Sequence, residues 1–206
     1  MRASAADAST DVSTQPPNAE FWGRPAHLTD GAATQPRLRR LLSDGACDVL
    51  HYAGHATVDP EHPGASCLDL GPQRLRAEVI MQSAAGTSAR ERGLCVCLAG
   101  CTTHLTRSAF DEALTLSSAF MIGGASSVIG SLWRLRDSSA AVMMFIIHRG
   151  LHRGLTPLLA LHRAQSWMLN PDRIIPAEMP ADLRDVLAGI DPADPVHWAG
   201  LVHQGA

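Results

Sequence analysis

Residues 47–55, CDVLHYAGH, decide the fold class of this chain together with residues 94–101, LCVCLAGC. Each stretch is an apolar run that leads into a glycine and then into a side chain capable of acid–base or nucleophilic chemistry. The unbroken apolar run at 94–98 predicts a strand buried on both faces, as in a parallel sheet. His55 and Cys101 are therefore expected at the ends of two buried strands.

Helical and strand patterns alternate along the rest of the chain. Strands are predicted at 48–53, 94–98, 127–133 and 198–203, with a weaker one at 67–70. Helices are predicted from the Thr34 cap to the Gly45 stop, at 75–84, at 108–122, from the Asp137 cap to His152, after Thr156-Pro157, and at 182–187. This alternation predicts an α/β domain with a mainly parallel sheet.

Three reactive side chains follow the predicted strands. In open α/β sheets ligands bind outside the carboxyl ends of the strands, so His55, Cys101 and Asp137 are expected to face one crevice. An imidazole beside a thiol accepts its proton and later protonates the leaving amine, which is the arrangement of a cysteine nucleophile. The backbone N–H groups of Ala56 and Cys101 would then bind the oxyanion.

Less reactive readings of the same residues remain open. A lone histidine after a strand is usually a turn residue, and a lone cysteine at a strand end is usually part of the core. A zinc site would use Cys95, Cys97, Cys101 and His104, but zinc ligands are usually spaced on a turn, whereas the first two share one face of a buried strand. They are better read as small core residues. Neither a P-loop nor a G-x-G-x-x-G follows a strand, so no cofactor and no metal are expected.

Composition restricts the class of protein. The 206 residues are 46% hydrophobic and 18% charged, which indicates a globular domain with a sizeable core. A net charge of −3 gives no reason to expect a nucleic-acid partner, and no apolar run is long enough to span a membrane. The N-terminus has no signal-peptide pattern, and the crowding of three of five cysteines into 95–101 favours a reducing cytoplasm. We expect a flexible tail or linker at 1–20 and one domain at 21–206.

Several blocks of the sequence resemble the CHAT domain family, the caspase-like and separase-related cysteine peptidases of clan CD. HYAGH (51–55) resembles the family's HxxGHG motif, and CLAGCTT (97–103) resembles its L-S-x-C-x-T strand end. Four further blocks resemble family segments and occur in family order: GAATQPRLRRLL (31–42), GGASSVIGSLWRLRDSSA (123–140), GLTPLLALHRAQSWML (154–169) and PVHWAGLVHQG (195–205).

The resemblance implies a caspase-like fold and cleavage of a protein substrate, with His55 as the base and Cys101 as the nucleophile. It also implies a regulatory partner or a fused sensor or TPR module. By the same resemblance Asp137 is expected to form the S1 pocket and to pair with a substrate arginine, although Asp137 is equally well placed to cap the next helix.

Two departures from the family pattern favour a different interpretation, in which the chain is a catalytically weak scaffold that binds partners. The family's glycine after the histidine is replaced by Ala56. About twenty low-complexity residues stand where the family begins with a further strand–helix unit, so that unit is expected to be missing or truncated.

Overall fold

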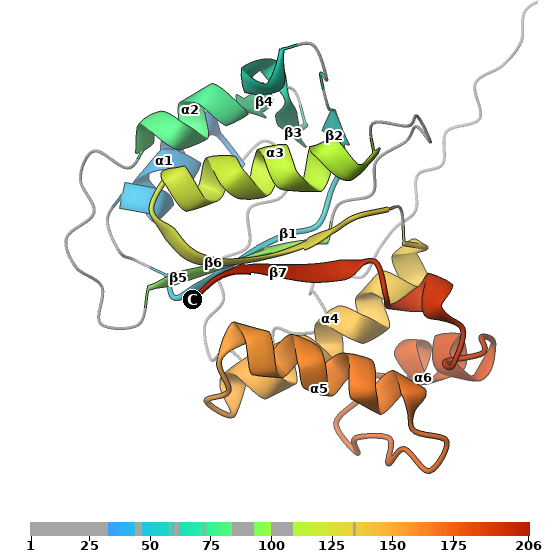
Figure 1. Ribbon diagram of the computed structural model, residues 1–206. Coiled ribbons are helices and arrows are strands. Elements are labelled where there is room, and N and C mark those ends of the chain that lie inside the picture. Colours follow the sequence, from blue (N-terminus) through green and yellow to red (C-terminus); the bar gives the residue numbers. More distant parts are fainter. Residues whose placement is uncertain are drawn as a thin grey trace, which may run out of the picture.

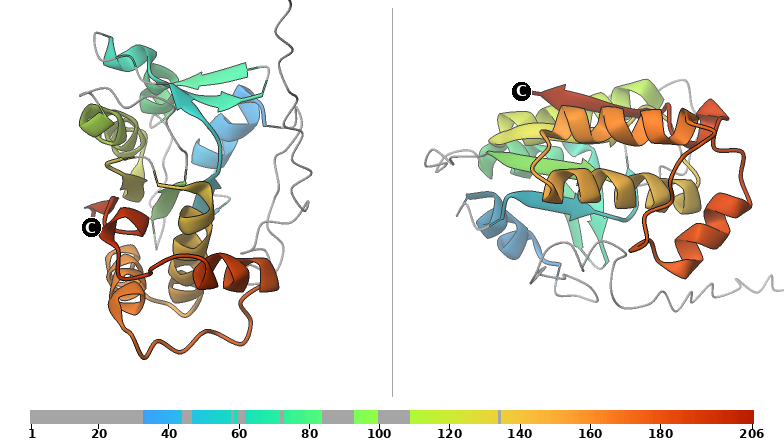
Figure 2. Two further views of the ribbon diagram at one scale, coloured as in Figure 1. Left: turned by 90° about the vertical axis from the view of Figure 1, so that its right-hand side faces the viewer. Right: turned by 90° about the horizontal axis from the view of Figure 1, so that it is seen from below.

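The computed structural model describes residues 33–43, 47–57, 59, 62–71, 73–83, 93–99, 109–133 and 135–206. A central sheet lies between two layers of helices, with a smaller sheet beside the upper layer (Figure 1). Seen along the sheet, the helices α4 to α6 lie on one side, and α1 to α3 with the small sheet lie on the other (Figure 2). The architecture is α/β, as the alternating pattern predicts.

The central sheet has the strand order β1-β5-β6-β7. β1 (Val49–Tyr52), β5 (Leu94–Leu98) and β6 (Ala125–Ser131) are parallel to one another, and β7 (Leu201–Gly205) pairs antiparallel with β6. Every residue of β5 is buried, which explains its unbroken apolar sequence. Among the described strands β1 is an edge strand, so its ladder hydrogen bonds run to β5 alone.

The upper layer contains α1 (Gln35–Ser43), α2 (Ala77–Met81) and α3 (Ala109–Ile122). It also contains the small antiparallel sheet, formed by β2 (Ala56–Thr57), β3 (Cys67–Leu70) and β4 (Gln73–Arg76), and the short helix η2 (Pro63–Ala65). Its core joins helices and both sheets through buried side chains: Leu38, Leu42, Leu68, Leu75, Ile80, Val96, Phe120 and Val128.

The lower layer contains α4 (Asp137–His152), α5 (Pro157–Leu169) and α6 (Ala181–Ala188), followed by the short helix η4 (Pro195–His197). α4 is the central helix, because five consecutive side chains at 143–147 are buried. The Thr156 side chain caps α5 by accepting from the Leu159 N–H, and Pro157 opens its first turn. This is the start that the Thr-Pro pair predicts.

Three boundaries differ from the sequence prediction. The helix predicted at 75–84 is observed as α2 but begins only at Ala77, since Leu75 and Arg76 belong to β4, which pairs with β3. The third strand is displaced and runs over Ala125–Ser131 rather than 127–133. The last strand begins at Leu201, because 195–197 form η4.

Candidate active site

The carboxyl ends of three parallel strands meet at one edge of the central sheet. His55 follows β1, residues 100–108 follow β5, and Asp137 opens the helix after β6. In Figure 1 both β2, which directly follows His55, and the start of α4 lie at this end of the sheet. Cys101 lies outside the described residues, so its position after β5 stays a prediction.

His55 lies where the chain passes from the large sheet to the small one. Its side chain is exposed, and its carbonyl oxygen accepts from the Asp69 N–H of β3 at 2.9 Å. The Tyr52 hydroxyl is a second donor to that carbonyl and also lies 2.9 Å from the carbonyl of Asp69. Burial, followed by the charge of Asp69, raises the pKa of Tyr52, so its hydroxyl keeps the proton that it donates. The backbone that presents His55 is therefore tied to both sheets.

Position 54 must be a glycine because the neighbouring Tyr52 leaves no space for a side chain. A Cβ at this position would lie 2.7 Å from the Tyr52 hydroxyl oxygen and 2.9 Å from the ring carbon that carries it. The glycine therefore allows the close approach of the Tyr52 ring to the backbone.

Ala56 begins β2 and stands opposite Leu68 of β3. The neighbouring pair, His55 and Asp69, shares a ladder hydrogen bond. Because hydrogen-bonded and non-hydrogen-bonded pairs alternate in an antiparallel ladder, Ala56 occupies a non-hydrogen-bonded position with its N–H directed away from β3. The Ala56 N–H is therefore not used in the ladder with β3.

Asp137 is the first residue of α4, with an exposed side chain. The residue at the N-cap is Arg136, and no side chain makes a capping hydrogen bond there. The expectation that Asp137 caps the helix is therefore wrong. The carboxylate lies in the first turn, where it interacts with the helix dipole.

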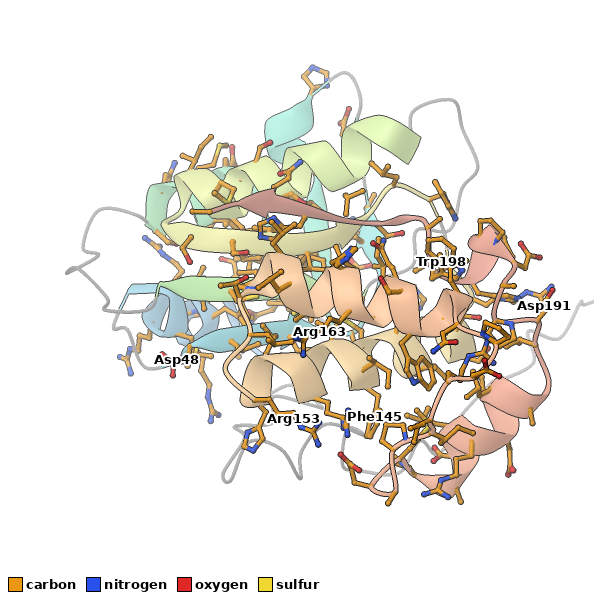
Figure 3. The ribbon with its side chains drawn as sticks, turned by 60° about the horizontal axis from the view of Figure 1, so that its bottom comes forward. Asp48, Phe145, Arg153, Arg163, Asp191 and Trp198 are labelled. Carbon is orange, nitrogen blue, oxygen red and sulfur yellow. The ribbon has the colours of Figure 1, made fainter. Side chains whose placement is uncertain are left out.

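Two contacts fix the segments around the start of α4. Ser139, which is fully buried, is hydrogen-bonded to Nδ1 of His197 at 2.8 Å and so joins α4 to η4. The Trp133 ring lies against Gly200, where a Cβ would approach it to 2.7 Å. In Figure 3 Trp198 lies at this end of the sheet and Asp48, the residue before β1, lies at the opposite end.

Cys95 and Cys97 lie in the core under α4, as predicted for small buried residues. The two thiols are hydrogen-bonded to each other, and this bond together with burial raises the pKa of Cys97. Cys97 therefore stays protonated and is unsuited to act as the nucleophile. In the described part of the chain, no three His, Cys, Asp or Glu side chains are grouped to hold a metal ion. Cys101 and His104, the other two ligands of the zinc reading, lie outside that part.

His51 and His148 form a pair beneath the site that the sequence did not predict. Nδ1 of His51, in β1, lies 2.7 Å from Nε2 of His148, in α4, and the two ring planes are inclined by only 17° with centroids 4.9 Å apart. Burial lowers the pKa of His51 to about 4, and burial followed by the charge of His51 lowers that of His148 to about 3. The signal in the sequence is one histidine in a buried strand and another in the buried helical run AAVMMFIIH.

Comparison with known proteins identifies a matching protein family. The family model of the CHAT domain matches residues 12–206. No curated protein matches the chain. The match begins inside the predicted tail at 1–20, and the division between tail and domain stays a prediction because residues 1–32 lie outside the described part. Among the described helices, none has the length and apolar character needed to cross a membrane.

Proposed function

This chain belongs to the CHAT domain family, and we propose that it is a cysteine endopeptidase with a catalytic dyad of His55 and Cys101. The observation that carries the proposal is the adjacency of two parallel strands. β1 and β5 pair in register from Val49 with Cys95 to Tyr52 with Leu98, so the two strands end side by side at the carboxyl edge of the sheet. In the sequence, His55 stands three residues after the end of β1, and Cys101 stands three residues after the end of β5.

The chemistry assigns one role to each group. The His55 imidazole takes the proton of the Cys101 thiol, and the thiolate attacks the carbonyl carbon of the scissile peptide. The Ala56 N–H, directed away from β3, donates to the oxyanion as the carbonyl π bond opens. When the C–N bond breaks, the imidazolium returns its proton to the amine. Water then hydrolyses the thioester, which restores the thiol and releases the carboxylic acid.

We further propose that the enzyme is a regulated cytoplasmic effector that acts on a protein substrate. β1 is an edge strand among the described residues, and an edge strand offers unpaired N–H and C=O groups to an additional strand. A regulatory partner, or a fused sensor or TPR module, would complete the scaffold beneath His55 by covering that edge. The isolated chain is accordingly expected to be latent or weakly active.

Covalent labelling tests the proposed function directly. The chain is incubated with a peptidyl acyloxymethyl ketone, and the modified residue is mapped by mass spectrometry. Selective labelling of Cys101, abolished in His55→Ala, would support the dyad. Labelling of the half-buried Cys47 alone, at the same rate in His55→Ala, would contradict it and would favour a non-catalytic scaffold.

The oxyanion role of Ala56 gives a prediction. We expect Ala56→Gly to change the turnover rate by less than about tenfold, because the strand backbone already directs the N–H away from β3. Losing an oxyanion donor outright would cost about 10²–10³-fold. Steady-state hydrolysis of a fluorogenic peptide measures the rate, and a melting curve provides the control, since Ala56 also packs against the upper core. A hundredfold loss at unchanged stability would exclude Ala56 from the site as described.

The exposed carboxylate of Asp137 gives a second prediction, concerning specificity. If Asp137 forms the S1 pocket, the enzyme prefers arginine before the scissile bond, because a carboxylate binds a guanidinium through two charge-assisted hydrogen bonds. Asp137→Asn is then expected to abolish this preference in a peptide library. Stability should change little, since Asp137 is not the helix cap and its interaction with the helix dipole contributes only about 0.3–1 kcal/mol. An unchanged arginine preference would remove Asp137 from the pocket.

A further inference from the structure

The hydrogen bond between His51 and His148 joins two elements of different character. β1 is a four-residue edge strand whose residues are only half-buried, whereas α4 is buried along its centre and His148 is 2% exposed. The contact at 2.7 Å between the nearly parallel rings is a polar link between the strand and the helix. The bond is partly buried on the side of His51 and fully buried on the side of His148, which limits competition with water.

The bond requires at least one neutral ring, and burial keeps both rings neutral at pH 7 by lowering the pKa of each. One ring nitrogen must donate and the other must accept, and a protonated imidazole has no acceptor nitrogen. Two titratable side chains lie near the pair along β5 and α4. Cys97, which stands opposite His51 in β5, is held as a thiol by its bond with Cys95 and by burial. His152, one turn further along α4, is exposed.

The position of His51 connects this link to the site. His51 is the first residue of HYAGH, and the chain leaves β1 at Tyr52, only three residues before His55. The Tyr52 hydroxyl then contacts the His55 carbonyl, so any shift of β1 is transmitted to the backbone of His55. On the other side β1 has no strand neighbour among the described residues, so the contact with α4 adds a polar anchor to the β5 ladder and to the Tyr52 contact with β3.

We propose that His51 and His148 are positioning residues, whose hydrogen bond holds β1 against α4 and thereby fixes the turn that presents His55. The proposal rests on the proposed function for its effect on the reaction, but the holding of β1 is measurable without activity.

The test compares His148→Gln with His148→Leu in the full chain. The Gln amide can reach the position of the imidazole Nε2 and keep a bond to His51, whereas Leu fills a similar volume without one. Amide hydrogen exchange is measured at pH 7 across the molecule, together with the rate at which the acyloxymethyl ketone probe labels Cys101. The Leu variant is expected to accelerate exchange at 49–57 and to slow labelling, each by about tenfold, as for the loss of one buried hydrogen bond. The Gln variant should stay within about threefold of the wild type.

Each outcome decides the matter. Exchange that rises in β1 and β2 of the Leu variant, but not in α5, supports the positioning role, and rescue by Gln confirms that the bond rather than the bulk of the side chain is responsible. Exchange that rises evenly over the whole chain, or does not change at 49–57, overturns it. If the wild type is not labelled at all, the proposed function fails, while the exchange pattern still decides whether the pair holds β1.

Discussion

Replacing Cys101 with alanine is expected to abolish peptide cleavage, lowering kcat/KM by at least about 10³-fold. Alanine has no atom that can attack the carbonyl carbon, so only binding and the oxyanion donors remain. His55→Ala is expected to have an effect of similar size, because the thiol then lacks its base. Hydrolysis of a fluorogenic peptide measures both changes, and circular dichroism shows whether each variant keeps the fold, which we expect because the His55 side chain is exposed.

The matched control for this result is Cys97→Ala, four residues before the proposed nucleophile. Cys97 is fully buried and its burial and bond to Cys95 keep it protonated. We expect the variant to lose about 1 kcal/mol of stability and to keep its activity. If Cys97→Ala removed turnover at unchanged stability, or if Cys101→Ala retained it, the nucleophile would be wrongly assigned.

Acidification is expected to destabilise the protein strongly between about pH 6.5 and pH 4. The pKa values of His51 and His148 are lowered by burial, from 6.5 to about 4 and about 3. Above pH 6.5 both histidines are neutral in the folded and in the unfolded protein, so they do not change the free energy of unfolding. Below it the unfolded chain binds protons that the folded pair cannot accept, so stability falls as the pH falls, by roughly 2 kcal/mol for each histidine at pH 5. Urea unfolding at a series of pH values measures this slope.

The control for the acid effect is the double variant His51→Asn, His148→Gln, which replaces both rings with amides that do not titrate. Its free energy of unfolding is expected to stay flatter between pH 6.5 and pH 4 than that of the wild type. The interpretation would be refuted if the two proteins showed the same slope, since other groups would then account for the loss.

Sequence patterns predict those helices and strands that are specified by their own residues rather than by pairing with distant segments. β5 follows from five consecutive apolar residues, and α5 follows from a capping threonine with a proline in the first turn. β4 could not be predicted, because QRLR carries a single apolar residue and becomes a strand only by pairing with β3. The local pattern of 75–84 favours a helix, and the pairing with β3 overrides it only at Leu75 and Arg76, before α2 begins.

The candidate site shows the same division. His55 and Asp137 are found from their positions after strands, since the carboxyl ends of parallel strands share one edge of the sheet. The reason for Gly54 could not be read, because it depends on where the Tyr52 ring lies. The contact of His51 with His148 joins residues 97 positions apart, and no periodicity in either segment indicates it. Pairwise contacts across the core are decided by packing, which sequence patterns describe only in outline.

The pairing of β1 with β5 has a consequence for how the protein reaches its active form. Val49 pairs with Cys95, although the two residues are far apart in the sequence. In the same sheet β6 pairs with the last strand, β7, where Ile129 stands opposite His203. Contacts between such distant segments require large loops to close, which makes folding slow and cooperative. A nascent or partly folded chain is therefore expected to lack the proposed peptidase activity, because the strands that lead to His55 and Cys101 are not yet paired.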